Sequence, residues 1–368
     1  MTDLRAKDDN VFNGADAPKL FGEAKLKRAF GAAIAATALL MSCGPTAPTE
    51  EAASVAPTPT TSIDRLDPAI DAIIAPGVVP EKIGGEYGFT EGPVWVNGEI
   101  RFSDLTGNKL YAIDANGVSR ELMDKSGGLD VTAPDSFQGS NGSVVDKDGS
   151  VLMNQHGLRR IVKVDKDLKV TTFLDKFNGK KFNSPNDLVY APDGSLWITD
   201  PPYGMVGQDN DPAKEQTVNA VYRYAGGKLT QVITDLPRPN GIGFSPDGKK
   251  LYVSNSEPEM FVNVYDVNAN GTVANGKRFI TFPPPNPAWG VPDGLKVDSA
   301  GNVWASGPDG IRVIDPTGKV LGQIKSPDRA QANLAFGGAD FKTAYIMAAG
   351  SVYKLPLLIA GEKPLYAN

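Results

Sequence analysis

Six polar residues occupy the same place in a repeated sequence pattern, and together they have the chemistry of a cation site. They are Glu91, Asn141, Asn186, Asn240, Asp293 and Asn333. Two carboxylates and four amides offer oxygen ligands with a net charge of −2, which suits a hard divalent cation, most simply Ca²⁺. The set contains neither His nor Cys, which disfavours zinc, although the sequence leaves Zn²⁺, Mn²⁺ and Mg²⁺ open as the bound ion.

These residues could instead act only as turn formers, because Asn and Asp commonly begin turns. Glu91 argues against that interpretation, since glutamate is a poor turn former and yet occupies the same place in the repeat. We therefore expect the six side chains to converge.

The repeat itself predicts the fold. In the copies that begin at Asn141, Asn186, Asn240 and Asp293, a turn glycine follows the leading residue by eight positions, between two short apolar runs. Successive leading residues lie 50, 45, 54, 53 and 40 residues apart. Such a period, built from short strands, is typical of a β-propeller with four strands per blade, and Asp-Gly supplies the positive φ of a tight hairpin. The sequence thus predicts an all-β, six-bladed propeller over residues 76–368, whereas a pair of β-sandwiches would not explain six copies in one frame.

The propeller determines where the leading residues should lie. Equivalent positions of different blades are found at one height around the central axis. We therefore expect the six leading residues to form a ring at one end of the channel, where they would make an axial metal site.

His156 is the only histidine and a second candidate for chemistry. It lies just beyond a strand expected in the copy that begins at Asn141, so its imidazole could face the ring or could be a structural or surface group. Arg159 follows three residues later and could either bind an acidic substrate or hold the edge of the blade.

Several motifs resemble the gluconolactonase and senescence-marker-protein (regucalcin-like) family, from about Glu81 to Leu355. They are Phe89-Thr90-Glu91-Gly92-Pro93-Val94-Trp95, Ser184-Pro185-Asn186-Asp187-Leu188, Asp200-Pro201-Pro202-Tyr203-Gly204, Arg238-Pro239-Asn240-Gly241 and Val291-Pro292-Asp293-Gly294-Leu295. The resemblance implies a six-bladed propeller, an axial divalent metal and hydrolysis of sugar lactones.

The resemblance also implies roles for individual residues. Glu91, Asn240 and Asp293 match the recurrent metal ligands, and Asn186 matches a position that ligates the metal or orients the substrate. Asn141 and Asn333 occupy ring positions at which the family varies. Asn141, Asn186 and Arg159 are the candidates for substrate binding. The segment Gln155-His156-Gly157-Leu158-Arg159-Arg160 resembles a segment of bacterial members that begins with Glu-His-Gly and ends with Arg-Arg, with Gln155 in place of the Glu.

Lactone hydrolysis requires an activated water and stabilisation of an oxyanion. The candidates for the base are Asp293, with an ordinary pKa near 4, and His156, with an ordinary pKa near 6.5. The ordinary values favour His156 and the family precedent favours Asp293, so the choice stays open. No Gly-x-Ser-x-Gly elbow occurs in the propeller, which removes the usual sign of a serine nucleophile.

The net charge of −6 argues against nucleic acid as a partner, because phosphate backbones are bound by basic surfaces. Two other function classes stay open: a related metal-dependent hydrolase of phosphotriesters, and a non-catalytic binding module. The acidic members of the expected ring speak against the binding module. The sequence leaves open the oligomeric state and the lactone used.

The N-terminal segment predicts export. Lys25, Lys27 and Arg28 precede an apolar stretch at residues 29–41 that ends in Leu40-Met41-Ser42-Cys43-Gly44, which resembles a bacterial lipobox with Cys43 as the lipidated residue. The alternative is a buried free cysteine. We expect a signal and lipobox region at residues 1–43, with more residues before Lys25 than such signals need, and a flexible tether at residues 44–75. The protein would then be a periplasmic, membrane-tethered lipoprotein that meets the membrane only through its lipid.

Overall fold

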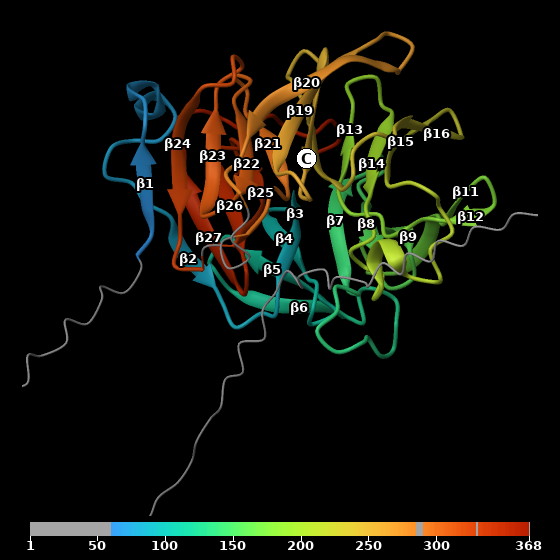
Figure 1. Ribbon diagram of the computed structural model, residues 1–368. Coiled ribbons are helices and arrows are strands. Elements are labelled where there is room, and N and C mark those ends of the chain that lie inside the picture. The colour runs from blue at the N-terminus through green and yellow to red at the C-terminus, as the bar shows by residue number, and fades with distance from the viewer. Residues whose placement is uncertain (1–59, 285–289, 329, 368) are drawn as a thin grey trace, which may run out of the picture. The chain divides into compact units, whose positions relative to one another are not determined.

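The computed structural model describes residues 60–284, 290–328 and 330–367 (Figure 1). The expected signal region, Cys43 and residues 44–59 of the expected tether lie outside the described residues. Within the described ranges, no helix has the length and apolar character needed to span a membrane.

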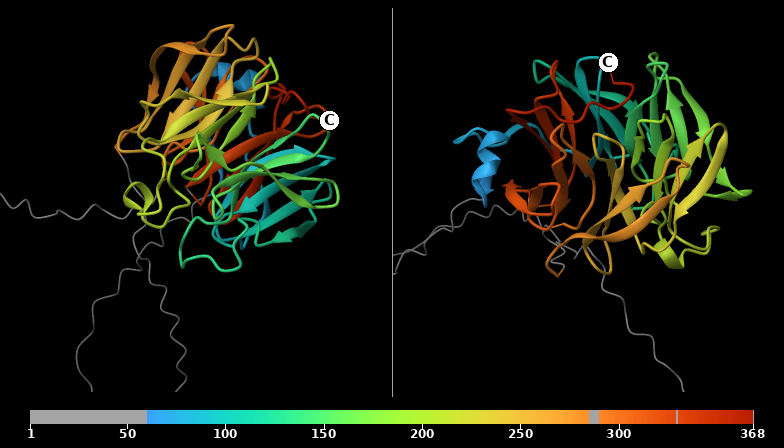
Figure 2. Two further views of the ribbon diagram at one scale, coloured as in Figure 1. Left: turned by 90° about the vertical axis from the view of Figure 1, so that its right-hand side faces the viewer. Right: turned by 90° about the horizontal axis from the view of Figure 1, so that it is seen from above.

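The described chain folds into antiparallel sheets arranged around a central axis (Figures 1 and 2), and the prediction of an all-β six-bladed propeller is confirmed. The first three blades each contain four strands. Blade one contains β3 (Thr90–Val96), β4 (Glu99–Asp104), β5 (Lys109–Asp114) and β6 (Ser119–Asp124); blade two contains β7 (Ser140–Val145), β8 (Val151–Gln155), β9 (Arg160–Val164) and β10 (Val170–Leu174); blade three contains β13 (Leu188–Tyr190), β14 (Leu196–Asp200), β15 (Ala220–Ala225) and β16 (Lys228–Ile233).

The last three blades follow the same order, and two of them recruit a strand from the N-terminal part of the chain. Blade four contains β17 (Pro239–Phe244), β18 (Lys250–Asn255), β19 (Phe261–Val267) and β20 (Val273–Thr281); blade five contains β21 (Leu295–Val297), β22 (Val303–Gly307), β23 (Gly310–Ile314), β24 (Val320–Lys325) and β1 (Ser62–Arg65); blade six contains β25 (Gln331–Gly337), β26 (Thr343–Ala348), β27 (Ser351–Pro356) and β2 (Glu81–Gly84). A small hairpin, β11 (Lys176–Phe177) and β12 (Lys180–Lys181), and two short 3-10 helices, η1 (Pro68–Ala72) and η2 (Gln208–Asn210), complete the elements.

The innermost strands pack side by side around the axis. β3 packs against β7, β7 against β13, β13 against β17, β17 against β21, β21 against β25, and β25 against β3 again. The ring is also closed by β2, which precedes blade one in the chain but pairs with β27 as the outer strand of blade six. Closure of this kind leaves few exposed sheet edges.

The repeated turn glycines have the predicted conformation. The four that follow a leading residue by eight positions are Gly149, Gly194, Gly248 and Gly301, and their φ angles are +81°, +79°, +68° and +85°. Each lies between the two innermost strands of its blade. The positive φ explains why glycine recurs there.

The prediction of a flexible tether as far as residue 75 is wrong for residues 62–75. β1 pairs with β24, from Ser62 opposite Lys325 to Arg65 opposite Gly322. The following helix η1 is capped by Asp67, whose carboxylate accepts a hydrogen bond from the Ala69 amide at 2.9 Å, and its Ile70 is fully buried. The composition that predicts a tether ends near residue 61, and the apolar residues beyond it pack against blade five.

Candidate functional site

The six leading residues lie at the starts of the six innermost strands, so the structure brings them to one end of the axis. We call them the axial ring: Glu91, Asn141, Asn186, Asn240, Asp293 and Asn333. Five of them are no more than 3% exposed, and Asp293 is partly exposed.

Close contact between neighbouring inner strands explains why glycine follows most leading residues. A Cβ atom on Gly92 would lie 2.0 Å from the Asn141 carbonyl oxygen, and one on Gly142 would lie 2.4 Å from the Asn186 carbonyl oxygen. The Gly142 amide donates to that Asn186 oxygen at 2.8 Å. The glycines therefore allow each blade to bind the next directly at the level of the ring.

Three ring amides form a directed chain of hydrogen bonds. Asn141 Nδ2 donates to Asn186 Oδ1 at 2.6 Å, Asn186 Nδ2 donates to Asn240 Oδ1, and Asn240 Nδ2 donates to Ser256 Oγ at 3.0 Å. At the start of this chain, Asn141 Oδ1 is buried and has no hydrogen-bond partner within the described residues.

The carboxylates give the ring its charge. Glu91 Oε2 accepts hydrogen bonds from its neighbour Gly92 and from Asn333 Nδ2 at 2.9 Å, whereas Glu91 Oε1 is buried without a partner in the described part of the chain. Burial and the nearby charge of Asp187 raise the pKa of Glu91 to about 7. Desolvation and the charge of Glu91 raise the pKa of Asp293 well above its ordinary value.

These observations fit a divalent cation. Two mutually repelling carboxyl groups and two buried oxygen atoms without donors, Glu91 Oε1 and Asn141 Oδ1, are the environment that a positive ion would stabilise. Over the described residues, no cluster of three or more His, Cys, Asp or Glu side chains is found, so a cation in this ring would be bound partly by amide oxygens.

Asn333 belongs to the ring, but its oxygen is directed away from the other members. Its Oδ1 accepts hydrogen bonds from the Leu334 amide at 2.8 Å and from Lys296 Nζ at 3.1 Å. Both partners can only donate, so the amide NH₂ must face Glu91. Asn333 therefore orients Glu91 and offers no free oxygen to an ion.

The sequence pattern gave no role to Lys296 or to its partner Asp187. The Lys296 ammonium lies 3.3 Å from Asp187 Oδ2, and the Asp187 side chain is 5% exposed. A signal for Lys296 exists in the repeat: it stands three residues after the leading residue, where the other inner strands have Val94, Val144, Val189, Gly243 and Phe336. A charged residue at an apolar repeat position indicates a buried polar contact.

His156 joins the ring from the turn after β8 and is fully buried. Its Nδ1 lies 2.8 Å from the Phe137 carbonyl oxygen and must donate to it, so Nε2 accepts from Asn141 Nδ2 at 3.2 Å. Burial lowers the pKa of His156 to about 4. The environment thus lowers the pKa of His156 and raises that of Asp293, which is opposite to the trend in the ordinary values from which His156 was favoured as the base.

Arg159 is not brought to the ring. Its Nε donates to the carbonyl oxygens of Phe182 and Asn183 at 2.7 Å and 3.1 Å, and its Nη1 donates to that of Ala213 at 2.8 Å. These bonds hold neighbouring loops together, whereas Arg159 Nη2 is buried without a partner among the described residues, so both roles of this residue stay open.

Comparisons with known proteins place these features in a family. A family model described as the SMP-30/Gluconolactonase/LRE-like region matches residues 89–350. The chain is 36% identical over 308 residues to a gluconolactonase of Zymomonas mobilis, covering 80% of this chain and 85% of that protein. It is 28% identical over 271 residues to the pentonolactonase XacC of Haloferax volcanii, covering 71% and 81% of the two chains. A solved structure of a gluconolactonase from Xanthomonas campestris superposes with a TM-score of 0.69 at 28% identity, covering 82% of this chain and 95% of that one.

The matched region contains the whole axial ring, from Glu91 to Asn333. Its extent and the identity to the Zymomonas protein together show the relationship. The chain belongs to the SMP-30/gluconolactonase/LRE-like family.

Proposed function

We propose that this protein hydrolyses the internal ester of a sugar lactone to the aldonic acid, using a divalent cation, Ca²⁺ in the simplest case, held in the axial ring. Glu91, Asn186, Asn240 and Asp293 would be its ligands. The observation that carries the proposal is Glu91 Oε1, a buried carboxyl oxygen without a partner among the described residues, in a ring whose carboxyl groups repel each other. The activities of the Zymomonas and Haloferax relatives support the choice of substrate class.

A cation bound in the ring would supply polarisation of the lactone carbonyl and neutralise charge on its oxygen. The protein's own groups position the substrate and move the proton. The Asp293 carboxylate accepts a proton from water, the water oxygen bonds to the carbonyl carbon, and the ring C–O bond breaks. The proton then passes to the leaving alkoxide, which leaves a hydroxy acid.

His156 has a supporting part in this scheme. Its imidazole is neutral above a pH of about 4 and accepts a hydrogen bond from Asn141 Nδ2. It therefore fixes the orientation of the Asn141 amide, which is the first member of the hydrogen-bond chain through Asn186 and Asn240. Asn141 Oδ1 is left without a hydrogen-bond partner among the described residues and would accept a hydrogen bond from the substrate.

The test is a substrate panel with purified protein. Glucono-δ-lactone, a pentonolactone and a phosphotriester are offered after chelation and after Ca²⁺, Mn²⁺, Mg²⁺ or Zn²⁺ is restored. We expect lactone hydrolysis that disappears on chelation and returns with one or more of the ions. Turnover that is unaffected by complete chelation would contradict the metal dependence, and hydrolysis of the phosphotriester alone would favour the related hydrolase.

The proposal includes a place of action outside the cytoplasm, on a lipid attached to Cys43. Its support is the lipobox-like run that ends at Cys43 and the described propeller that follows residue 60. A Cys43→Ser variant should lose incorporation of labelled fatty acid and leave the membrane fraction. Unchanged membrane association of that variant would contradict the anchor.

A further inference from the structure

Tyr203 lies in a loop at the ring end of blade three. β13 begins next to Asn186 and β14 is antiparallel to it, so β14 ends at the level of the ring. The Asn186 amide donates to the Thr199 carbonyl oxygen at 2.8 Å, which fixes that register. The residues that follow Asp200 therefore emerge beside the axial ring.

The loop is fastened to groups that neighbour the ring. Ser184 Oγ donates to the Pro201 carbonyl oxygen at 2.6 Å and accepts from the Gly204 amide at 2.9 Å. Gly204 packs so closely on the histidine that a Cβ there would lie 2.5 Å from His156 Cβ. Tyr203 is thus held between two fixed backbone positions.

Arg238 holds the aromatic ring of Tyr203 from the side of blade four. Its guanidinium carbon lies 5.5 Å from the centroid of that ring. Arg238 itself donates to Asp209 Oδ2 at 2.9 Å and to Glu257. The tyrosine is therefore preorganised by contacts with both neighbouring blades.

The hydroxyl group of Tyr203 is buried and has no hydrogen-bond partner in the described part of the chain. Among the described residues, Ser256 is close enough to lower the pKa of Tyr203 but is not within hydrogen-bond geometry, and Arg238, Glu257 and Asp293 are within electrostatic reach. Ser256 Oγ already accepts from Asn240 Nδ2 at 3.0 Å and donates to the Pro292 carbonyl oxygen at 2.7 Å. Burial raises the pKa of Tyr203 above its ordinary value, so the group remains a protonated donor.

We propose that the Tyr203 hydroxyl hydrogen-bonds a hydroxyl group of the lactone substrate and makes the enzyme specific for polyhydroxylated lactones. This inference rests on the proposed lactonase function. A buried hydroxyl without a partner costs free energy, which a substrate hydroxyl would offset. A site that hydrogen-bonds a substrate hydroxyl discriminates strongly against analogues that lack it.

The test compares two substrates in a Tyr203→Phe variant. Glucono-δ-lactone carries ring hydroxyl groups and δ-valerolactone carries none. We expect kcat/KM for glucono-δ-lactone to fall about 10- to 100-fold, mainly through KM, and kcat/KM for δ-valerolactone to change by less than about threefold. Metal affinity, measured by calorimetry, should stay unchanged.

Tyr222→Phe is the matched control. Tyr222 is fully buried in blade three, and its hydroxyl accepts a hydrogen bond from Gln231 Nε2 at 3.1 Å within that blade. Both substrates should respond alike to its loss. Melting temperatures of both variants show that they are folded.

The outcomes separate the inference from the function on which it rests. If Tyr203→Phe leaves both substrates unchanged or reduces both equally, the specificity role is overturned while the lactonase activity stands. If the wild-type protein hydrolyses neither lactone with any of the ions, the proposed function fails and the inference fails with it.

Discussion

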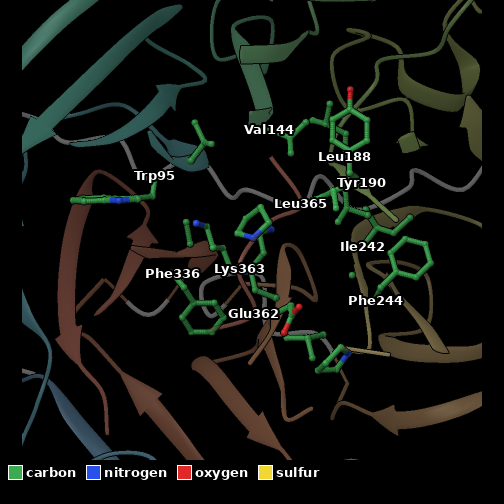
Figure 3. Close-up of a pocket in the computed structure, with 18 of the residues that line it drawn as sticks. Trp95, Val144, Leu188, Tyr190, Ile242, Phe244, Phe336, Glu362, Lys363 and Leu365 are labelled. Carbon is green, nitrogen blue, oxygen red and sulfur yellow. The ribbon is translucent and has the colours of Figure 1, made fainter. Parts of the chain in front are cut away.

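The two ends of the central channel are built by the same six strands but have opposite chemistry. At the ring end, the leading residue near the start of each strand presents a carboxylate or an amide. Further along the strands, a cavity of about 250 Å³ is lined mainly by apolar side chains, among them Trp95, Val144 and Phe244 (Figure 3). Along each inner strand, only two or three residues therefore separate the polar leading residue from the side chains that line the apolar cavity.

The apolar end is covered by the C-terminal tail. Glu362, Lys363, Pro364 and Leu365 line the cavity (Figure 3). The Glu362 amide donates to the Val297 carbonyl oxygen at 3.0 Å, and the ring of Tyr366 meets that of Tyr190 edge-on with centroids 4.8 Å apart. We therefore expect substitutions at the ring end to alter activity and those at the cavity end to alter stability.

The largest effect is expected from Glu91→Gln and Asp293→Asn. Each removes a carboxylate ligand, and kcat/KM should fall by about 10³-fold or more together with metal binding. The melting temperature of the metal-free protein should stay the same or rise, because one of two repelling charges is gone. Near-normal turnover by either variant would show that the carboxylate it lacks is not required for catalysis.

At the cavity end, Phe244→Ala should lower the stability of the protein and leave its activity nearly unchanged. Phe244 is 6% exposed and packs edge-on against Trp197 with ring centroids 5.4 Å apart. Its loss should lower the free energy of unfolding by about 3–5 kcal/mol, measured by chemical denaturation. The value of kcat/KM at a temperature where the variant is folded should change by less than about threefold. A large fall in kcat/KM there would show that the two ends are not separate.

At the ring end, Asp200 should lower the free energy of unfolding in a pH-dependent way. Asp200 is fully buried, its Oδ1 has no partner among the described residues, and burial raises its pKa to about 7. Between about pH 4 and pH 7 the folded state keeps a proton that the unfolded state releases, so this group lowers stability as the pH rises.

Asp200→Asn should therefore increase the free energy of unfolding by about 2–4 kcal/mol above pH 7 and have no such effect near pH 4. Asp167→Asn, at an exposed carboxylate, serves as the control and should change little at either pH. Equal effects of Asp200→Asn at both pH values would mean that its charge is not the cause.

The smallest effect is expected from Lys296→Met, at the residue between the two ends. Lys296 holds the oxygen of Asn333, which in turn donates to Glu91. Without it, Ca²⁺ affinity measured by calorimetry should fall about tenfold, or about 1.4 kcal/mol. If Lys296 acted only by repelling the cation, its removal would raise the Ca²⁺ affinity. A higher affinity in the variant would therefore overturn the orienting role. Lys250→Met, on the surface of blade four, is the matched control.

The local pattern was sufficient to predict the blades and the ring. Residues 186–194 and 240–248 repeat one frame because each hairpin needs a glycine with positive φ at the same distance from its leading residue. Rotation about one axis then brings Glu91 and Asn240 to the same height. By contrast, β1 and β2 carry no turn signature of their own, and their pairing is decided by the free edges of blades five and six, far away in the sequence.

The sequence therefore determines which residues form the axial ring, and the tertiary structure determines the role of each of them. Residue types and period place six polar side chains around one axis. Only the packed neighbours decide what each side chain can do: Lys296 turns the Asn333 oxygen away from the ring, and Phe137 fixes the tautomer of His156. The physical reason is that hydrogen-bond direction and desolvation depend on groups distant in the chain, which no local repeat encodes.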